Sequence, residues 1–355
     1  MTTTLRKLPR TEWDELASQF DDLSYRQCGS YAELAAKNVG AKCEFVGVFE
    51  GDGIIGLANV RIKTIPLLPL GIAYVNYGPL TARQGEFTAD HFGRSLAAIA
   101  QEYVYRRRLM LRVVPPLSGG QWLSEQASCF DLHSFFPSKQ QKPAETFILD
   151  LSKPLEEIRK KLDGKWRSDL SKAERSNLRI TKASSPSAFD SFEPLFLELV
   201  EQKNFSAPQD VAFFREVQKK AEAYEQLVLH LAWHEDKVIA GHLGSFVGDT
   251  ATYLLGAANS KGRDLRASFL LQWAVIQYAQ SIGKTFYDLG GINLQANPNV
   301  HRFKQRLNGR HVAEIGPYEL APSTFRCAVL GFVEQIYSRQ ILLRSIFKRQ
   351  HMRPL

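Results

Sequence analysis

The chain has 355 residues, of which 44% are hydrophobic and 23% are charged. This composition excludes a disordered or fibrous protein, and the length favours two domains over one. The 45 Lys and Arg against 37 Asp and Glu, with a pI near 9.2, predict an anionic partner such as a phosphate-bearing substrate, RNA or a membrane surface.

Residues 43–62 contain two apolar, β-branched runs around a Glu-Gly-Asp-Gly turn, which predicts a hairpin. A third strand is expected over residues 72–80. The apolar spacing of residues 88–106 predicts a helix, and residues 109–115 predict a buried strand.

The second half repeats this order. Residues 227–247 predict a strand, an acidic turn and a strand, followed by a third strand over 250–258. A helix is expected over 265–282 and a last strand over 285–289. The shared order favours a duplicated domain, and the alternative is two unrelated α/β units.

A polar, Pro-containing stretch at residues 137–146 separates the two halves. We therefore expect a first domain over 1–145 and a second over 146–325. Apolar residues at three- and four-residue steps after Pro154 predict one long amphipathic helix. Its other face is rich in Lys and Arg, and is either solvated or turned toward an anion.

Residues 326–355 mix apolar residues with Arg and Lys, which predicts a basic amphipathic C-terminal helix. Such a helix either lies on a membrane surface or packs on its own domain. No secretory signal or membrane span is expected from the sequence. The protein is therefore expected in the cytoplasm, with peripheral contact at the inner face of the membrane as one alternative.

Several common active-site motifs do not occur in the sequence. The chain has no G-x-S-x-G, GxxxxGK[ST] or H-E-x-x-H pattern. The four cysteines are far apart and form no Cys/His cluster, so we expect no metal site and no disulfide framework.

Four other patterns carry the chemistry, together with a Gly78-Pro79 pair after the third strand. They are YRQCGSYAELAAKNVG (25–40), KWRSDLSKAERSNLRI (165–180), RDLRASFLLQWAVIQYAQSIG (263–283) and YDLGGINLQANPNVHRFK (287–304). In their order and spacing they resemble the FemABX family, non-ribosomal aminoacyltransferases that extend the peptide side chains of cell-wall precursors.

The resemblance covers roughly residues 25–320 and implies a fold of mixed α/β (α+β) class. Two tandem GNAT-like domains are expected, each a mixed, largely antiparallel sheet flanked by helices. Two features depart from the classical members: Val114 stands where an acidic residue often precedes the proline, and residues 187–226 are too short for a coiled arm. GNAT-like proteins of polysaccharide and lipid pathways therefore remain an alternative.

The segment before the helix expected over 265–282 bears on the identity of the acyl donor. Acetyl-CoA-dependent GNAT enzymes hold the pyrophosphate with R-x-x-G-x-G/A at a helix start. Here that stretch is RDLRAS, which lacks the glycines. This favours aminoacyl-tRNA over acyl-CoA as co-substrate, with no tightly bound cofactor, and the candidate donor-binding residues are Arg263, Arg266, Ala267 and Ser268.

Acyl transfer to an amine needs an in-line approach and stabilisation of the tetrahedral oxyanion. Lys304 is the candidate for that electrostatic role, and Asp288, at a strand end, is the candidate that orients or deprotonates the amine. Gly290 and Gly291 would allow a close backbone approach or a positive φ. The alternatives are a surface lysine, an Asp that caps its own loop, and a purely structural turn.

The resemblance implies that Lys37, Lys165 and Arg167 meet an acceptor diphosphate. Tyr74 and Tyr77 are candidates for the acceptor groove. The remaining candidates follow the glycine loop: Arg302, and Phe303, which is expected to anchor that loop in the core and so aim Lys304.

The sequence leaves three candidate functions. The first is amide formation on an amine of a peptidoglycan-type, phosphate-bearing cell-envelope precursor, with aminoacyl-tRNA as donor. The second is acyl-CoA-dependent N-acetyl or N-acyl transfer to an amino sugar or small amine in polysaccharide or lipid biosynthesis. The third is a non-catalytic GNAT-like module that binds a glycan or partner. No DNA partner is expected.

Overall fold

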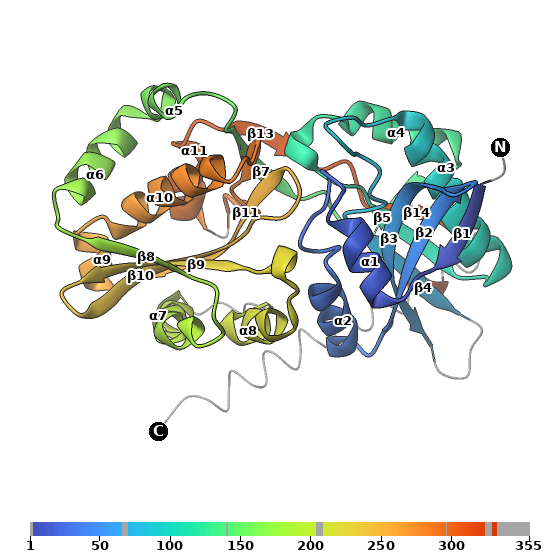
Figure 1. Ribbon diagram of the computed structural model, residues 1–355, viewed down its shortest axis with the longest axis horizontal. Coiled ribbons are helices and arrows are strands. Elements are labelled where there is room, and N and C mark those ends of the chain that lie inside the picture. Colours follow the sequence, from blue (N-terminus) through green and yellow to red (C-terminus); the bar gives the residue numbers. More distant parts are fainter. Residues whose placement is uncertain are drawn as a thin grey trace.

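Two halves lie side by side in the computed structural model, each built on one seven-stranded sheet (Figure 1). The structure describes residues 3–65, 70–139, 141–203, 209–295, 297–323 and 329–331. The elements that precede the boundary are β1 (Thr3–Lys7), α1 (Arg10–Ala17), α2 (Gly29–Asn38), β2 (Lys42–Glu50), β3 (Gly53–Thr64), β4 (Gly71–Asn76), α3 (Ala89–Ala100), a π-helical turn (Gln101–Arg106), β5 (Met110–Val114), α4 (Leu123–Leu132) and β6 (Phe136–Pro137).

The remaining elements include the seven strands of the second sheet, the helices that cover them and a last strand, β14. They are β7 (Glu145–Asp150), α5 (Leu155–Lys161), α6 (Gly164–Glu174), β8 (Arg179–Ala183), α7 (Ala188–Lys203), α8 (Val211–Lys220), β9 (Val228–His234), β10 (Lys237–Ser245), β11 (Thr250–Ala258), α9 (Ser260–Asp264), α10 (Ala267–Ser281), β12 (Phe286–Asp288), α11 (Pro298–Gln305), β13 (Arg310–Ala313) and β14 (Tyr318–Leu320).

The predicted repeat is present in three dimensions. The first sheet has the order β1-β2-β3-β4-β5-β14-β6 and the second has β13-β7-β12-β11-β10-β9-β8. Among the described strands, each sheet has one parallel pair, β4 with β5 and β11 with β12. Each parallel pair is joined by a helix, α3 or α10, so the predicted mixed, largely antiparallel sheets flanked by helices are confirmed.

Strand β14 follows the second sheet along the chain but lies in the first sheet, between β5 and β6. A buried ion pair holds it there, because Arg112 of β5 and Glu319 of β14 are 2.6 Å apart. The sequence-based domain boundaries assigned these residues to the second domain, whereas their hydrogen bonds connect them to the first.

The prediction of a single long helix after Pro154 is wrong. Helix α5 ends at Lys161, and α6 begins at Gly164. The side chain of Asp163 accepts hydrogen bonds from the backbone N–H groups of Lys165 (2.9 Å) and Trp166 (3.2 Å), and so caps the second helix. The apolar spacing continues across the break because both helices pack on the same core of the second half.

The two halves share an apolar interface. Tyr25 and Tyr31, next to and within α2, pack with Phe213 and Phe214 of α8. Arg10 of α1 pairs with Glu225, at 3.1 Å, across the same boundary. Residues from both halves therefore line a common boundary.

The predicted C-terminal helix over 326–355 lies outside the described residues, apart from 329–331. In the part of the chain that the structure describes, no helix combines the length and the apolar character needed to cross a bilayer.

Candidate active site

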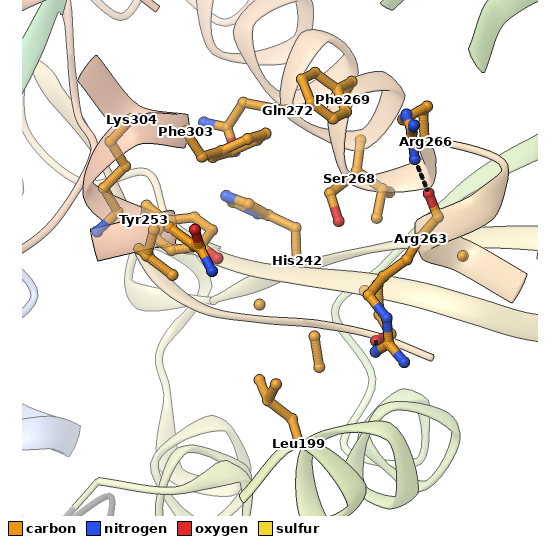
Figure 2. Close-up of a pocket in the computed structure, with 18 of the residues that line it drawn as sticks. Leu199, His242, Tyr253, Arg263, Arg266, Ser268, Phe269, Gln272, Phe303 and Lys304 are labelled. Atoms are coloured by element: carbon orange, nitrogen blue, oxygen red, sulfur yellow. Dashed lines mark hydrogen bonds between the residues drawn. The ribbon is translucent and has the colours of Figure 1, made fainter. Parts of the chain in front are cut away.

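A cavity of about 610 Å³ lies in the second half, next to α10. Strands β11 and β12 pair only from Thr250–Phe286 to Thr252–Asp288. Strand β11 then continues along β10 as far as Ala258, and the space beyond the end of β12 is open. We call it the α10 cavity; its lining includes His242, Tyr253, Ser268, Phe269, Phe303 and Lys304 (Figure 2).

The first turn of α10 borders this cavity. Arg266, before the helix, has a φ of 58°, and no side chain in the described structure caps the helix. Uncapped N–H groups and the helix dipole favour a negative or partly negative group at this end. Arg263, Arg266 and Ser268 line the cavity, while Ala267 is buried beside them.

The two arginines are engaged within the same segment. Arg263 donates to the carbonyl of Ala258 at 2.8 Å. Arg266 donates to the carbonyl of Arg263 at 2.8 Å, drawn dashed in Figure 2, and to Asp169 at 3.3 Å. The structure thus brings the candidate donor-binding residues together at a helix start, with their guanidinium groups partly used by neighbouring oxygens.

Lys304 is a buried lysine with two carbonyl partners. Its Nζ donates to the carbonyl oxygens of Gly290 (3.1 Å) and Gly291 (2.9 Å), and lies 5.1 Å from the centroid of the Tyr253 ring. Burial lowers its pKa from 10.5 to about 8, and the nearby charge of Asp288 opposes this shift. A lysine ammonium has three N–H donors, so one remains for a reacting group in the cavity.

Phe303 precedes Lys304 on α11, a short helix where the sequence predicted a loop. Its ring lies 6.0 Å from Trp166 and 5.1 Å from Phe269, measured between centroids. These contacts attach α11 to the core of the second half. The predicted anchoring of Lys304 by Phe303 agrees with this packing.

Asp288 is buried at the end of β12. One carboxylate oxygen accepts from the hydroxyl of Thr146 (2.5 Å) and from the backbone N–H of Gly290 (2.8 Å). Gly290 has a φ of 72°, and a Cβ there would lie 2.6 Å from the carbonyl oxygen of Tyr253. Asp288 therefore does cap its own loop, and the glycine is needed for both its backbone angle and the close approach to β11.

A second cavity, of about 230 Å³, lies between the halves. We call it the interdomain cavity. Its lining includes Arg26 and Tyr77 from the first half, and Asp288, Gly290 and Glu314 from the second. Tyr253 lines both cavities, so Lys304 and Asp288 border adjoining spaces that meet at this residue.

Five predicted substrate-binding residues line neither cavity in the described structure. Lys37 and Arg302 are exposed. The hydroxyl of Tyr74 donates to Asn76 at 3.0 Å, Lys165 lies 3.5 Å from Asp169, and Arg167 donates to the carbonyl of Leu162 at 2.8 Å. Their contacts with an acceptor stay predictions.

The sequence analysis missed a buried polar network beside the α10 cavity. The hydroxyl of Tyr287 lies 2.8 Å from Nε2 of His242 and accepts from Gln272 at 2.7 Å. Burial holds the pKa of His242 well below its usual value, so the ring is neutral. These residues come from β10, β12 and α10 and have no common spacing, so no sequence motif marks them.

The chain is similar to known proteins both in sequence and in fold. A family profile described as an acetyltransferase (GNAT) domain matches residues 159–305. The lipid II:glycine glycyltransferase of Staphylococcus saprophyticus is 23% identical over an alignment that covers 69% of this chain and 74% of that protein.

Two solved structures share the fold. The structure of FemX superposes with a TM-score of 0.76 at 16% identity and covers 90% of this chain and 97% of that chain. A C-terminal domain described as that of a lysylphosphatidylglycerol synthetase, from Agrobacterium fabrum, superposes with a TM-score of 0.52 at 13% identity, covering 92% and 97%.

The tandem sheets, the open parallel strand pair and the profile match define an acyltransferase of the GNAT class. Within that class, the two-domain arrangement and the shared sequence support a FemABX-like family.

Proposed function

We propose that the chain forms an amide bond on an amine of a peptidoglycan-type cell-envelope precursor, with aminoacyl-tRNA as the acyl donor. The observation that carries this proposal is the pair of cavities that share Tyr253, one beside Lys304 and the other beside Asp288. The staphylococcal relative is named a lipid II:glycine glycyltransferase. This name supports a peptidoglycan precursor as the class of acceptor.

In this proposal, the donor ester lies in the α10 cavity with its carbonyl near Lys304, and the acceptor amine reaches it from the interdomain cavity. The amine nitrogen attacks the carbonyl carbon, so a C–N bond forms and the C–O bond to the tRNA ribose breaks. The amine loses its proton to Asp288, and Lys304 donates a proton to the leaving ribose oxygen. A pKa of about 8 makes Lys304 a stronger acid than a solvated lysine.

The charge of Lys304 also stabilises the tetrahedral oxyanion. One well-placed donor of this kind contributes about 3–4 kcal/mol to the barrier reduction. The carbonyls of Gly290 and Gly291 hold the ammonium in place before the reaction, so little reorganisation is needed when charge develops.

Acyl-CoA is the alternative donor, and the uncapped start of α10 favours it, because a free helix N-terminus accommodates a pyrophosphate. The replacement of the glycines by Arg266 and Ser268 counts against it, since side chains there limit the approach of a phosphate to the backbone. Contact of the basic segment 326–355 with the inner face of the membrane would bring the enzyme to a lipid-linked acceptor.

The test is a donor screen with the purified full chain. Lipid II in detergent is incubated with tRNA charged with labelled amino acids or, separately, with labelled acetyl-CoA, and label in lipid II is counted. We expect transfer from aminoacyl-tRNA alone. Transfer from acetyl-CoA alone would establish the alternative donor, and no transfer from either would overturn the proposed function.

A further inference from the structure

Arg26 lines the interdomain cavity. Its guanidinium carbon lies 4.6 Å from the centroid of the Tyr25 ring and 4.2 Å from that of Tyr77. Its backbone carbonyl accepts from the side chain of Asn59 at 3.1 Å. Stacking on two tyrosine rings restricts the guanidinium to one plane.

This guanidinium has no hydrogen-bond or ion-pair partner among the described residues. Two other buried or half-buried arginines do have carboxylate partners: Arg112 pairs with Glu319, and Arg10 with Glu225. A guanidinium has five N–H donors in a planar fork that matches a carboxylate. Arg26 therefore presents unused donors to the cavity.

The other charged residues that line the cavity are acidic. Glu145, Asp288 and Glu314 all line it, and the carboxylate of Glu314 accepts from the hydroxyl of Tyr77. Carboxylates attract an ammonium group and repel a phosphate, which carries more negative charge than a carboxylate. One stacked cation among acids therefore suits a head group with one carboxylate and one amine.

The cavity has the right size and spacing for such a head group. Its volume is about 230 Å³, which holds an amino-acid unit and leaves the rest of a precursor outside. Arg26 and Asp288 also line a smaller space of about 20 Å³ that adjoins Thr252 and Tyr77, so the two side chains approach the same small region from opposite halves.

We propose that the accepting amine carries a carboxylate on the same carbon atom, and that Arg26 binds this carboxylate while Asp288 receives the amine. The inference rests on the proposed function and adds the chemical class of its acceptor, an α-amino carboxylate head group. Arg26 is then a specificity-determining residue, because it separates such an amine from the isolated amine of a lysine side chain.

The test uses two acceptors that are identical except at one residue of the stem peptide. One is lipid II with meso-diaminopimelate, whose free amine has a carboxylate on its carbon, and the other is lipid II with lysine, whose side-chain amine has none. Binding is measured by calorimetry without donor, and kcat/KM is measured with the donor found above. The wild-type chain is expected to favour the diaminopimelate acceptor about 10- to 100-fold, the range for a charge-assisted contact.

Arg26→Gln is expected to remove this preference by weakening the diaminopimelate acceptor alone. Arg179→Gln is the matched control, because Arg179 stacks on Trp233 at 4.8 Å and lines neither cavity. Arg26→Lys keeps the charge without the fork and is expected to keep part of the preference. Equal binding of both acceptors by the wild type, or an equal loss for both in Arg26→Gln and Arg26→Lys, would overturn the inference.

The binding measurement separates this inference from the proposed function. If neither donor supports transfer but the diaminopimelate acceptor still binds more tightly through Arg26, the function fails and the acceptor class stands. If transfer proceeds with both acceptors alike, the function stands and the acceptor class fails.

Discussion

The two halves have the same order of elements but differ where their parallel strands end. In the first half, β4 pairs with β5 from Ile72–Met110 to Asn76–Val114. The link between the two strands continues past this point, because the N–H of Gly78 donates to the carbonyl of Val114 at 3.0 Å. In the second half, β12 ends at Asp288 and the α10 cavity opens beside β11.

The helix starts differ in the same way. Thr88 caps α3 by accepting from His91 at 3.3 Å, and the preceding Phe87 is stacked on Trp122 at 5.0 Å. No side chain in the described structure caps α10, which follows Arg266 and borders a cavity. One copy of the fold is closed by aromatic packing and a cap, and the other keeps an open gap and free N–H groups. The proposed donor site therefore depends on this gap, and not on the order of elements that both halves share.

The largest expected effect comes from Lys304, which lines the α10 cavity of the open half. Lys304→Met should lower kcat about 100- to 1,000-fold, because the oxyanion loses its cation. Lys182→Met is the control, since the exposed Lys182 also lies near a tyrosine ring, 4.0 Å from that of Tyr278. Steady-state transfer assays check both variants, and near-normal turnover by Lys304→Met would contradict the assigned role.

The second effect concerns the acid at the end of the short strand. Asp288→Asn should lower kcat about 100-fold through loss of a general base. The thermal midpoint should stay the same, because Asn keeps the acceptor oxygen for Thr146 and Gly290. Asp150→Asn provides the comparison: Asp150 ends β7, caps Ser152 in the same way at 2.9 Å and is exposed. Equal losses in the two variants would indicate a structural role for Asp288.

A smaller effect is expected from closing the open gap. Ser268 and Asp90 are the second residues of α10 and α3. Ser268→Phe should raise the KM for the donor about tenfold by occupying the α10 cavity, while Asp90→Phe, in the closed half, should leave it unchanged. Donor titrations at saturating acceptor measure this difference. An unchanged KM in Ser268→Phe would mean that the donor lies elsewhere.

The smallest effect is a dependence on pH. The pKa of Lys304 is lowered by burial from 10.5 to about 8, so the unfolded chain binds more protons than the folded chain between these values. The stability of the wild type should therefore rise relative to Lys304→Met as pH increases from 8 to 10. The transfer rate should fall over the same range, because the ammonium loses its proton. Urea unfolding and transfer-rate measurements at each pH test the two expectations. A stability difference between the wild type and Lys304→Met that does not change with pH would contradict the lowered pKa of Lys304.

Much of the fold could be predicted from local patterns. The strand expected at 250–258 coincides with β11, and the helix expected at 265–282 contains α10. Apolar residues at every second position indicate the buried face of a strand, and apolar residues at every third or fourth position indicate the buried face of a helix. The break at Asp163 was missed because the apolar spacing runs across it, although Asp163 is itself an N-cap residue.

The site was less predictable. The DLGG and Phe-Lys pattern predicts that Asp288, Gly290 and Lys304 face a common groove. The three residues are linked by hydrogen bonds through Gly290, but Lys304 lines the α10 cavity and Asp288 lines the interdomain cavity. Arg26 and Glu314, from opposite halves, were missed: Arg26 lies within the 25–40 pattern, where the candidate residue was Lys37, and Glu314 lies in none of the quoted patterns. Their meeting depends on how the halves pack, and no local spacing records that.

The sequence by itself determined the repeated order of elements, the FemABX resemblance and the lysine that follows the glycine loop, because these depend on near neighbours along the chain. The tertiary structure was needed to show that β14 returns to the first sheet, that the second parallel pair opens while the first is closed, and that Arg26 and Asp288 line the same cavity. Such features arise from packing between segments that are far apart in the sequence. The local spacing of apolar residues does not show which buried charges or strand ends will lie together.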